Sequence, residues 1–542
     1  MRSSLSRSAR QLTQHVNRPN ARPCWASGAK RWSSTEEDGH KWSTPLAKQL
    51  SEAITVAGPI PVASYMRQCL TSDLGGYYTS TGSPDRDQFG KKGDFVTSPE
   101  ISQIFGELIG VWVVAEWIAQ GKKSEGVYLM EVGPGRGTLM DDMLRTIRNF
   151  PPLAKAVEAV YMVEASQSLR ETQHKLLCGD NKLEQNEIGF QSVSRHSKDL
   201  KIIWTEDLRF VPREASKTPF IVAHEFFDAL PIHVFQSVPP APQQQQPEGT
   251  IQTPTGPIPV PTQQQRRLPQ ASQQSQWREL LVSPKPPHRL KEGEPEFEMS
   301  LSRGSTPHSM YLPETSSRYQ ALKSTDHATI EISPESQAFA ADFAVRLGGS
   351  NPQTTDAKAA NAPATGRTVA PLSKEQPLDK AEPSGAALVI DYGTPSTIPT
   401  NSLRGIRAHK RVSPFESPAA VDVSADVDFM ALAESALNAS PGVEVHGPAS
   451  QAQFLTAMGI EERAAQLVKK AVDKERAGST GQDRSELTEM VKRIESGWKR
   501  LVDTGPQGMG RLYQVMAIVP YKPAKAGEGR RRPVGFGGDV TL

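Results

Sequence analysis

Short apolar runs alternate with helix-like segments along most of the chain. Such runs occupy 127–132 (VYLMEV), 160–166 (VYMVEAS), 201–208 (KIIWTEDL) and 386–393 (AALVIDYG), and the last is RLYQVMAIVP at 511–520. Short continuous apolar runs are typical of strands that are buried on both faces of a sheet. Their alternation with helices predicts an α/β protein with a mostly parallel sheet.

Four further segments complete the predicted secondary structure. Residues 219–235 (PFIVAHEFFDALPIHVF) are predicted to form a fourth strand followed by a turn and a helix, and 277–282 resumes a strand pattern. Helical spacing of apolar residues is found at 44–76, interrupted by prolines. A charged helical stretch, broken by a glycine-serine turn, covers 461–503.

Another helix is predicted after the glycine- and aspartate-rich loop that ends in GDFVTSPE. Ser98 suits the N-cap position and Pro99 suits the first turn. From Glu100 to Trp112 the apolar residues recur at the spacing of one helix face.

Two segments lack the apolar residues that a packed core requires. Residues 239–276 contain 12 glutamines and 9 prolines with no aromatic residue, and 350–384 are rich in alanine, proline, threonine and lysine. Such segments cannot bury enough apolar surface to offset their ordering entropy, so both are predicted to be disordered inserts. The expected organisation is a helical cover at 44–125, an α/β domain at 126–520 and a flexible basic tail at 521–542.

Charge is unevenly distributed, although the formal net charge is only +2. Residues 1–35 hold seven basic residues and no acidic one. Abundant arginine and serine without acids predict a mitochondrial transit peptide, and the alternative is an ordinary basic tail. No apolar core of a secretory signal is present. The remaining chain is slightly acidic, which argues against a nucleic-acid partner.

Cysteine and membrane signals are both weak. Three widely spaced cysteines exclude a disulfide framework or a zinc knuckle and suit a reducing compartment. The most apolar stretch, 101–118, carries Glu107 and Glu116, and carboxylates are costly in lipid. No membrane insertion is predicted.

The segment EVGPGRG links the first predicted strand to a helix. A phosphate loop would require a lysine after the last glycine, and a dinucleotide turn would require that glycine one residue later. The pattern E-x-G-x-G-x-G fits the loop of S-adenosylmethionine (SAM) methyltransferases, and a tight packing turn is the alternative. The predicted cofactor-binding residues here are Glu131, Gly133, Pro134, Gly135 and Gly137.

Two further acids follow the next two strands. Glu164 ends the second strand, where a carboxylate can accept both ribose hydroxyls, and Asp207 follows the third, where an acid can meet the adenine amino group. Ligands of open α/β sheets bind beyond the carboxyl ends of the strands. Each acid alone could be a solvated loop residue, but three at successive strand ends favour a SAM site.

The fourth strand ends in HEFFD. A zinc motif H-E-x-x-H would need a second histidine where Asp228 stands, so no metal site is predicted. Glu225 and Asp228 are instead expected to face the transferred methyl group. The alternative is that they complement the dipole at the start of a helix.

Several long segments together resemble the MidA family. They are GDFVTSPEISQIFGELIGVW, EVGPGRGTLMDDMLR, HEFFDALPIHVFQ, ALVIDYG and SADVDF. The resemblance covers about 44–235, 277–346 and 385–520, and both inserts depart from it. It implies a Rossmann-like, seven-stranded SAM-dependent methyltransferase core with a helical N-terminal cover and a helical insertion near the C-terminus.

The resemblance also implies a function. Mitochondrial members of that family are protein arginine methyltransferases that support assembly of respiratory complex I. By this resemblance the chain would methylate, by symmetric dimethylation, an arginine on a peripheral-arm subunit of complex I in the mitochondrial matrix.

A chemical role for the acids can be reasoned separately. A guanidinium stays protonated at every accessible pH, so attack on a methyl group needs carboxylates that localise its charge. Glu225 and Asp228 are the candidates for this catalytic role, while Thr97, Ser98 and Glu100 are expected to contact SAM or substrate. A non-catalytic assembly chaperone and a small-molecule methyltransferase are the alternative functions.

Overall fold

The computed structural model describes most of the chain after its first forty residues. The described ranges are 41–72, 75–79, 93–240, 250–253, 256–259, 274–291, 293–353, 377–477, 484–506, 508–523 and 530–538. The predicted transit peptide at 1–35 lies outside these residues, as does most of both predicted inserts.

A ten-stranded mixed sheet organises the described residues, in the order β19-β20-β14-β7-β2-β3-β6-β5-β4 with β18 beside β14. Five neighbouring strands are parallel: β14 (Ala386–Thr394), β7 (Thr218–His224), β2 (Val127–Val132), β3 (Val157–Val163) and β6 (Lys201–Thr205). The others are β19 (Val443–Ser450), β20 (Tyr513–Pro520), β5 (Gly189–Val193), β4 (Glu184–Asn186) and β18 (Val427–Asp428).

The predicted α/β class is confirmed, and the sheet is larger than the seven strands expected. Seven consecutive strands run from β19 to β6, and the antiparallel β5–β4 hairpin and the short β18 extend them. β2 is buried along its whole length, as its continuous apolar run predicted.

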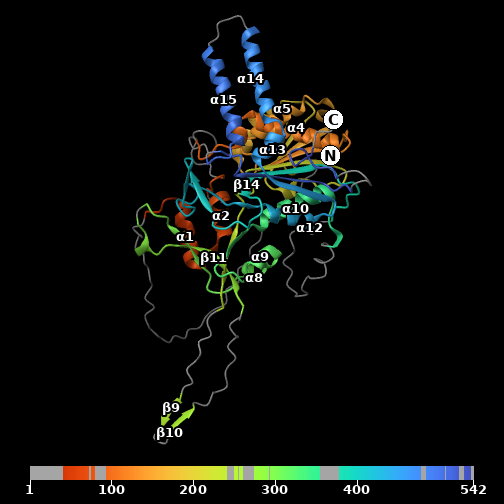
Figure 1. Ribbon diagram of the computed structural model, residues 1–542. Helices are drawn as coiled ribbons and strands as arrows, with labels where there is room; N and C mark the ends of the chain where they lie inside the picture. Colours follow the sequence, from red (N-terminus) through yellow and green to blue (C-terminus); the bar gives the residue numbers. More distant parts are fainter. Residues whose placement is uncertain are drawn as a thin grey trace, which may run out of the picture. The chain divides into compact units, whose positions relative to one another are not determined.

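Helices cover both faces of this sheet (Figure 1). One apolar cluster includes α4 (Gln103–Ala119) and α5 (Thr138–Ile147), and the other includes α10 (Pro334–Gly348) and α12 (Phe429–Ala439). Two more helices connect the parallel strands: α6 (Pro151–Ala156) and α7 (Gln167–Cys178). The carboxyl edge of the parallel strands therefore lies between two packed layers.

The predicted N-terminal helices are confirmed as α1 (Pro45–Ala57) and α2 (Val62–Thr71). They share an apolar cluster with a second, antiparallel sheet. Its strands are β1 (Ile60–Pro61), β11 (Gln276–Pro284), β8 (His233–Val238), β13 (Thr329–Ile332) and β12 (Phe297–Leu301).

The prediction of a helix after the fourth strand is wrong. Residues 225–232 contain no helix, and the chain continues into β8 of the second sheet. The run HVFQSV is long enough only for a strand, and Pro231 separates it from the turn. Glu225 and Asp228 therefore do not stand at a helix N-terminus.

The helix predicted from Glu100 is divided into α3 (Ser98–Ile101) and α4. Ser102 between them is extended, with φ −154°, and its side chain accepts from the Ile104 N–H. The N-cap of α3 is Thr97 rather than Ser98, and the Thr97 N–H donates to the Glu100 carboxylate (3.4 Å). The Ser98 hydroxyl therefore does not cap the helix and can serve another role.

Smaller elements complete the described chain. The predicted C-terminal helices are confirmed as α14 (Ile460–Ala477) and α15 (Arg484–Val502), which pack side by side (Figure 1). The others are α8 (Pro307–Tyr311), α9 (Ser317–Ala321), α13 (Gln451–Ala457), β9 (Thr250–Thr253), β10 (Gly256–Pro259), β15 (Arg404–Arg407), β16 (Lys410–Val412), β17 (Asp422–Ser424), η1 (Leu208–Phe210), η2 (Pro287–Arg289) and η3 (Leu312–Glu314). β9 and β10 pair antiparallel inside 239–276, so the prediction that this segment is disordered is wrong for these strands. Among the described helices, none combines the length and apolarity needed to cross a membrane.

Candidate active site

The glycine-rich segment forms a tight turn between β2 and α5. Gly133, Gly135 and Gly137 have φ values of 64°, 51° and 82°, a region that side chains with a Cβ rarely adopt. The Gly133 N–H donates to the Val163 carbonyl (3.1 Å), and the Gly137 N–H donates to Pro134 (2.7 Å). The turn is thus fixed to the end of β3.

Two of these glycines are also places of close approach. A Cβ on Gly133 would lie 2.6 Å from the Phe226 ring, and one on Gly137 would lie 3.2 Å from the Gln173 side chain. Glycine is therefore required at Gly133 both by φ and by the neighbouring HEFFD segment.

Gln173 of α7 joins the predicted cofactor residues to each other. Its side-chain N–H group donates to the Gly135 carbonyl (2.6 Å) and to Glu164 (3.3 Å), while its oxygen accepts from the Trp204 indole (3.0 Å). Gln173 is completely buried. The glycine turn, the end of β3 and β6 thus meet at one buried amide.

Glu131 and Glu164 are both buried at this edge. Burial, followed by the charge of Glu164, raises the pKa of Glu131 to about 8, and burial raises the pKa of Glu164 to about 7. Two neighbouring acids of this kind favour a ligand that supplies positive charge or hydrogen-bond donors.

Two buried atoms at this edge fit such a ligand. Glu131 Oε2 and Ser98 Oγ have no hydrogen-bond partner among the described residues. A buried polar atom without a partner costs about 1–3 kcal/mol, so both atoms are suited to a polar ligand. An amino acid with an ammonium group, as carried by SAM, supplies suitable donors for Glu131.

Asp207 takes a different position from the other acids. Its carboxylate caps η1 by accepting from the Arg209 N–H (2.9 Å), and it pairs with the Arg209 guanidinium (2.7 Å). The Asp207 side chain is 34 % exposed. The structure therefore does not connect it with Gln173, and an adenine contact for Asp207 remains a prediction.

Helix α3 lies between the glycine turn and the HEFFD segment. Glu100 pairs with Arg136 of the turn (3.2 Å), and the Ser98 N–H donates to the Glu225 carboxylate (3.3 Å). The predicted contact residues Thr97, Ser98 and Glu100 are thus placed beside both groups of predicted site residues.

The backbone of residues 225–228 is held by a buried aspartate. Asp391 accepts from the N–H groups of Phe226 (3.0 Å), Phe227 (2.7 Å) and Asp228 (3.4 Å). Glu225 itself has φ 50°, an uncommon value for a residue with a side chain. Such strain is found where surrounding contacts impose it, often at functional sites.

The two predicted catalytic acids, Glu225 and Asp228, are buried close to each other, and burial disfavours their charged forms. Burial, then the charge of Asp228, raises the pKa of Glu225 to about 8. Burial raises the pKa of Asp228 to about 6, although the Arg404 guanidinium opposes this. Because burial raises the pKa of both acids, a bound cation would favour their ionised forms and suits this site.

Two tyrosines, Tyr392 and Tyr513, lie near the same acids. The Tyr392 and Tyr513 rings are 4.0 Å apart, and Arg404 lies 5.4 Å from the Tyr392 ring centre. His224, between Phe105 (5.0 Å) and Tyr513 (6.4 Å), has its pKa lowered to about 3 by burial, so its imidazole is neutral. The site already accommodates one guanidinium, beside carboxylates and a ring face.

Sequence reasoning missed five of these residues: Gln173, Asp391, Tyr392, Arg404 and Tyr513. Asp391 had a signal, since it is an acid near the end of the predicted strand 386–393, next to a tyrosine. Gln173 lies in an amphipathic helix, and nothing in its spacing distinguishes it from a surface residue.

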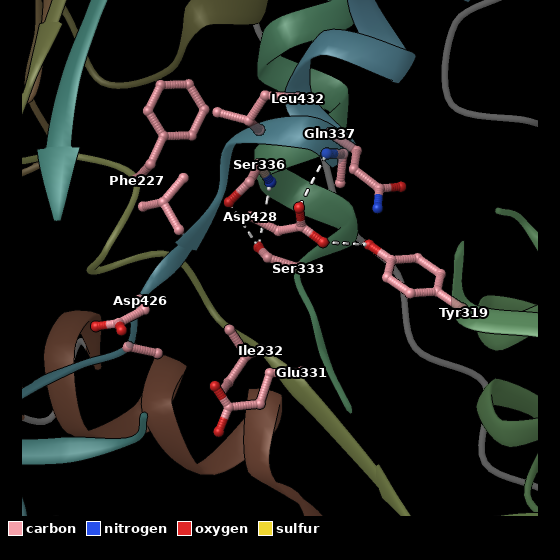
Figure 2. Close-up of a pocket in the computed structure, with 13 residues that line it drawn as sticks. Phe227, Ile232, Tyr319, Glu331, Ser333, Ser336, Gln337, Asp426, Asp428 and Leu432 are labelled. Carbon is pink, nitrogen blue, oxygen red and sulfur yellow. Dashed lines mark hydrogen bonds between the residues drawn. The ribbon is translucent and has the colours of Figure 1, made fainter. Parts of the chain in front are cut away.

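The structure also has a small cavity and a larger groove outside the predicted site residues. One cavity of about 20 Å³, a size that holds about one water molecule, is lined by Phe227, Tyr319, Asp426 and Asp428 among others. Figure 2 shows the Tyr319 hydroxyl directed at the Asp428 carboxylate, which it meets at 3.0 Å. A larger groove of about 770 Å³ is lined by β19, α13 and residues 530–537, and none of its lining residues belongs to the predicted site.

Comparison with known proteins identifies relatives of similar length. Proteins named "Protein arginine methyltransferase NDUFAF7, mitochondrial" from Homo sapiens and its homolog from Drosophila melanogaster are each 31% identical, over 93% and 90% of this chain and 89% and 87% of theirs.

Solved structures show the same fold. A COG1565 superfamily member from Burkholderia thailandensis, bound to S-adenosyl-homocysteine, has a TM-score of 0.55 at 20% identity and covers 88% of this chain and 92% of its own. A family model for S-adenosyl-L-methionine-dependent methyltransferases matches residues 108–449. The chain therefore belongs to this family of SAM-dependent methyltransferases.

Proposed function

We propose that this protein transfers a methyl group from SAM to an arginine side chain of a protein. The supporting observation is the buried pair Glu225 and Asp228, which stands next to a guanidinium and two tyrosine rings. The names of the relatives agree with this assignment.

The glycine turn would hold the cofactor. We assign the amino-acid part to Glu131 and Ser98, whose buried oxygens lack partners among the described residues, and the ribose to Glu164. Gly133, Pro134, Gly135 and Gly137 would let the backbone approach closely. When bound, SAM supplies an electrophilic methyl group on a sulfonium.

Glu225 and Asp228 would bind the incoming guanidinium. Because burial raises both pKa values, the two acids carry less negative charge until a cation arrives. A guanidinium near them favours their ionised forms, and the resulting charge-assisted hydrogen bonds would orient one nitrogen for attack. Holding the reacting atoms in line would supply most of the remaining rate enhancement.

The finer assignment follows the family resemblance. We propose that the target is a peripheral-arm subunit of complex I, that the product is symmetric dimethylarginine, and that the reaction takes place in the mitochondrial matrix. The basic, acid-free segment 1–35 supports delivery to mitochondria.

The test is transfer of labelled methyl from SAM into a mitochondrial extract that lacks this protein. With the full chain added, we expect one labelled protein band whose hydrolysate contains dimethylarginine. Glu225→Gln should lower transfer by about 100-fold or more, within the usual range for a group acting in the transition state, with SAM binding retained.

Other outcomes would replace the proposal. Label in solvent-extractable products would favour a small-molecule methyltransferase. Measurable SAM binding with no transferred label would favour an assembly chaperone that keeps the fold.

A further inference from the structure

A second group of metal-binding side chains lies in the antiparallel sheet. His233 begins β8, Glu279 lies on the neighbouring β11, and His308 belongs to α8. The atoms that they could offer to a metal ion lie within 4.8 Å of one another. None of these residues is part of the proposed methyl-transfer site.

The distances within this group are close to those of a metal centre. His233 Nδ1 lies 2.7 Å from Glu279 Oε1, and His308 Nδ1 lies 3.6 Å from Glu279 Oε2. Zinc bonds of about 2.0–2.1 Å place tetrahedral ligands about 3.4 Å apart, and one candidate ligand atom from each of the three residues lies within 4.8 Å of the others. Small side-chain rotations would therefore bring the three groups onto one ion.

Burial of the group gives it both a protected and an open side. Glu279 is completely buried, and the His233 ring stacks on Phe235 of an apolar cluster (6.1 Å between ring centres). The His308 side chain is 48% exposed, and its ring centre lies 4.2 Å from that of His233. An ion could enter beside His308 and keep a water molecule there as a fourth ligand.

We propose that His233, Glu279 and His308 bind one divalent transition-metal ion, with zinc as the ion that suits them best. Two imidazoles and one carboxylate are a ligand set that zinc uses with an additional water. The ion would join three segments of the chain that are distant in sequence, and it would fix the start of β8.

The test is zinc binding by the full chain after treatment with a chelator. We expect one zinc ion at micromolar concentration, measured by competition with a chromogenic chelator, and a higher Tm when zinc is present. His308→Ala should lose this ion and the Tm increase. Its metal-free Tm should stay near that of the original chain, because the side chain is half exposed.

His288→Ala is the matched control, because His288 is an exposed histidine of η2 that lies outside the group. It should bind zinc like the original chain. Equal zinc uptake by the original chain and His308→Ala would show that His308 does not bind the ion. No uptake at micromolar zinc would show that His233 and Glu279 form only a hydrogen-bonded pair. Either result would overturn the proposal.

A spectroscopic measurement makes the test independent of folding of the variants. Cobalt added to the original chain should give the visible absorption bands of a four-coordinate site, and zinc should remove them. Octahedral bands, or none, would overturn the proposal. Neither measurement depends on methyl transfer. Failure of the zinc-site proposal can therefore be distinguished from failure of the proposed methyltransferase activity.

Discussion

The two halves of the sheet's carboxyl edge are constructed differently. At β2 and β3, the site is built from a five-residue turn and the acids at adjacent strand ends, and Gln173 joins the turn to Glu164. At β7 and β14, the 225–228 segment is held by Asp391, and its Asp228 interacts with Arg404 from a separate small sheet.

The first half can be recognised from a short stretch of sequence, whereas the second half depends on tertiary packing. A turn that requires positive φ at three positions is recorded in the sequence as glycines at fixed spacing. A group of side chains assembled from residues more than 150 positions apart leaves no such pattern. We expect changes in one half to affect cofactor binding, and changes in the other to affect transfer.

Gly135→Val should have the largest effect on the first half. Valine at φ 51° is strained by about 1–2 kcal/mol, and its branched side chain would stand where the cofactor approaches. We expect SAM affinity to fall by about 100-fold or more, equivalent to about 2.7 kcal/mol, in a folded protein. Calorimetric titration measures this, and unchanged affinity would refute the loop assignment.

Asp391→Ala should mainly damage the second half. Three backbone N–H groups would lose their buried acceptor, at a total cost of about 2–4 kcal/mol in the free energy of unfolding. Asp391→Asn retains an acceptor oxygen and should lose less. Urea titrations of both variants decide this, and equal stability of Ala and Asn would contradict the assigned role. SAM affinity should change by less than about threefold, or about 0.7 kcal/mol.

The pH dependence of stability should distinguish Glu131 from an ordinary surface glutamate. Folding raises the pKa of Glu131 from 4.5 to about 8, so between these values the folded state holds a proton that the unfolded state lacks. The contribution of this group to stability is therefore present at low pH and is lost as pH rises toward 8.

Glu131→Gln should remove this dependence, so that the free energy of unfolding falls less between pH 5.5 and 8 than in the original chain. Glu158→Gln is the matched control. The pKa of Glu158 is lowered by its hydrogen bond from Lys217, so its effect lies below its ordinary pKa. Equal slopes for the Glu131 variant and the original chain would exclude the assigned pKa.

The smallest effect is expected from removing residues 241–273. Val238 at the end of β8 pairs directly with Gln276 at the start of β11, so a short turn can connect them. We expect Tm to change by less than about 2 °C, equivalent to less than about 2 kcal/mol for a domain of roughly 400 residues. A large fall in a thermal unfolding scan would show that the segment stabilises the sheet.

Sequence patterns predicted the main strands well because their apolar runs are continuous. The run at 127–132 coincides with β2, and 386–393 differs from β14 by one residue. The glycine turn was also predicted, because its need for positive φ is met by glycines within a few neighbouring residues. Of the three acids expected at strand ends, Glu131 and Glu164 are buried next to each other, and Gln173 joins Glu164 to the glycine turn.

The segment after Glu225 shows why the rest could not be predicted. EFFDALPIHVF has the composition of either a helix or a strand, and only pairing of His233 with Ile332 in a second sheet decides between them. Arg404 and Tyr513 reach the acids from distant strands. Their roles depend on tertiary packing rather than on spacing.

Helix α3 gives the two halves a thermodynamic connection. Its Glu100 contacts the glycine turn and its Ser98 N–H contacts Glu225, so a ligand that shifts α3 changes the free energy of both contacts. Such coupling is reciprocal: if the bound cofactor strengthens substrate affinity by some factor, the substrate strengthens cofactor affinity by the same factor. A four-residue helix would then make each ligand dissociate less readily while the other is bound.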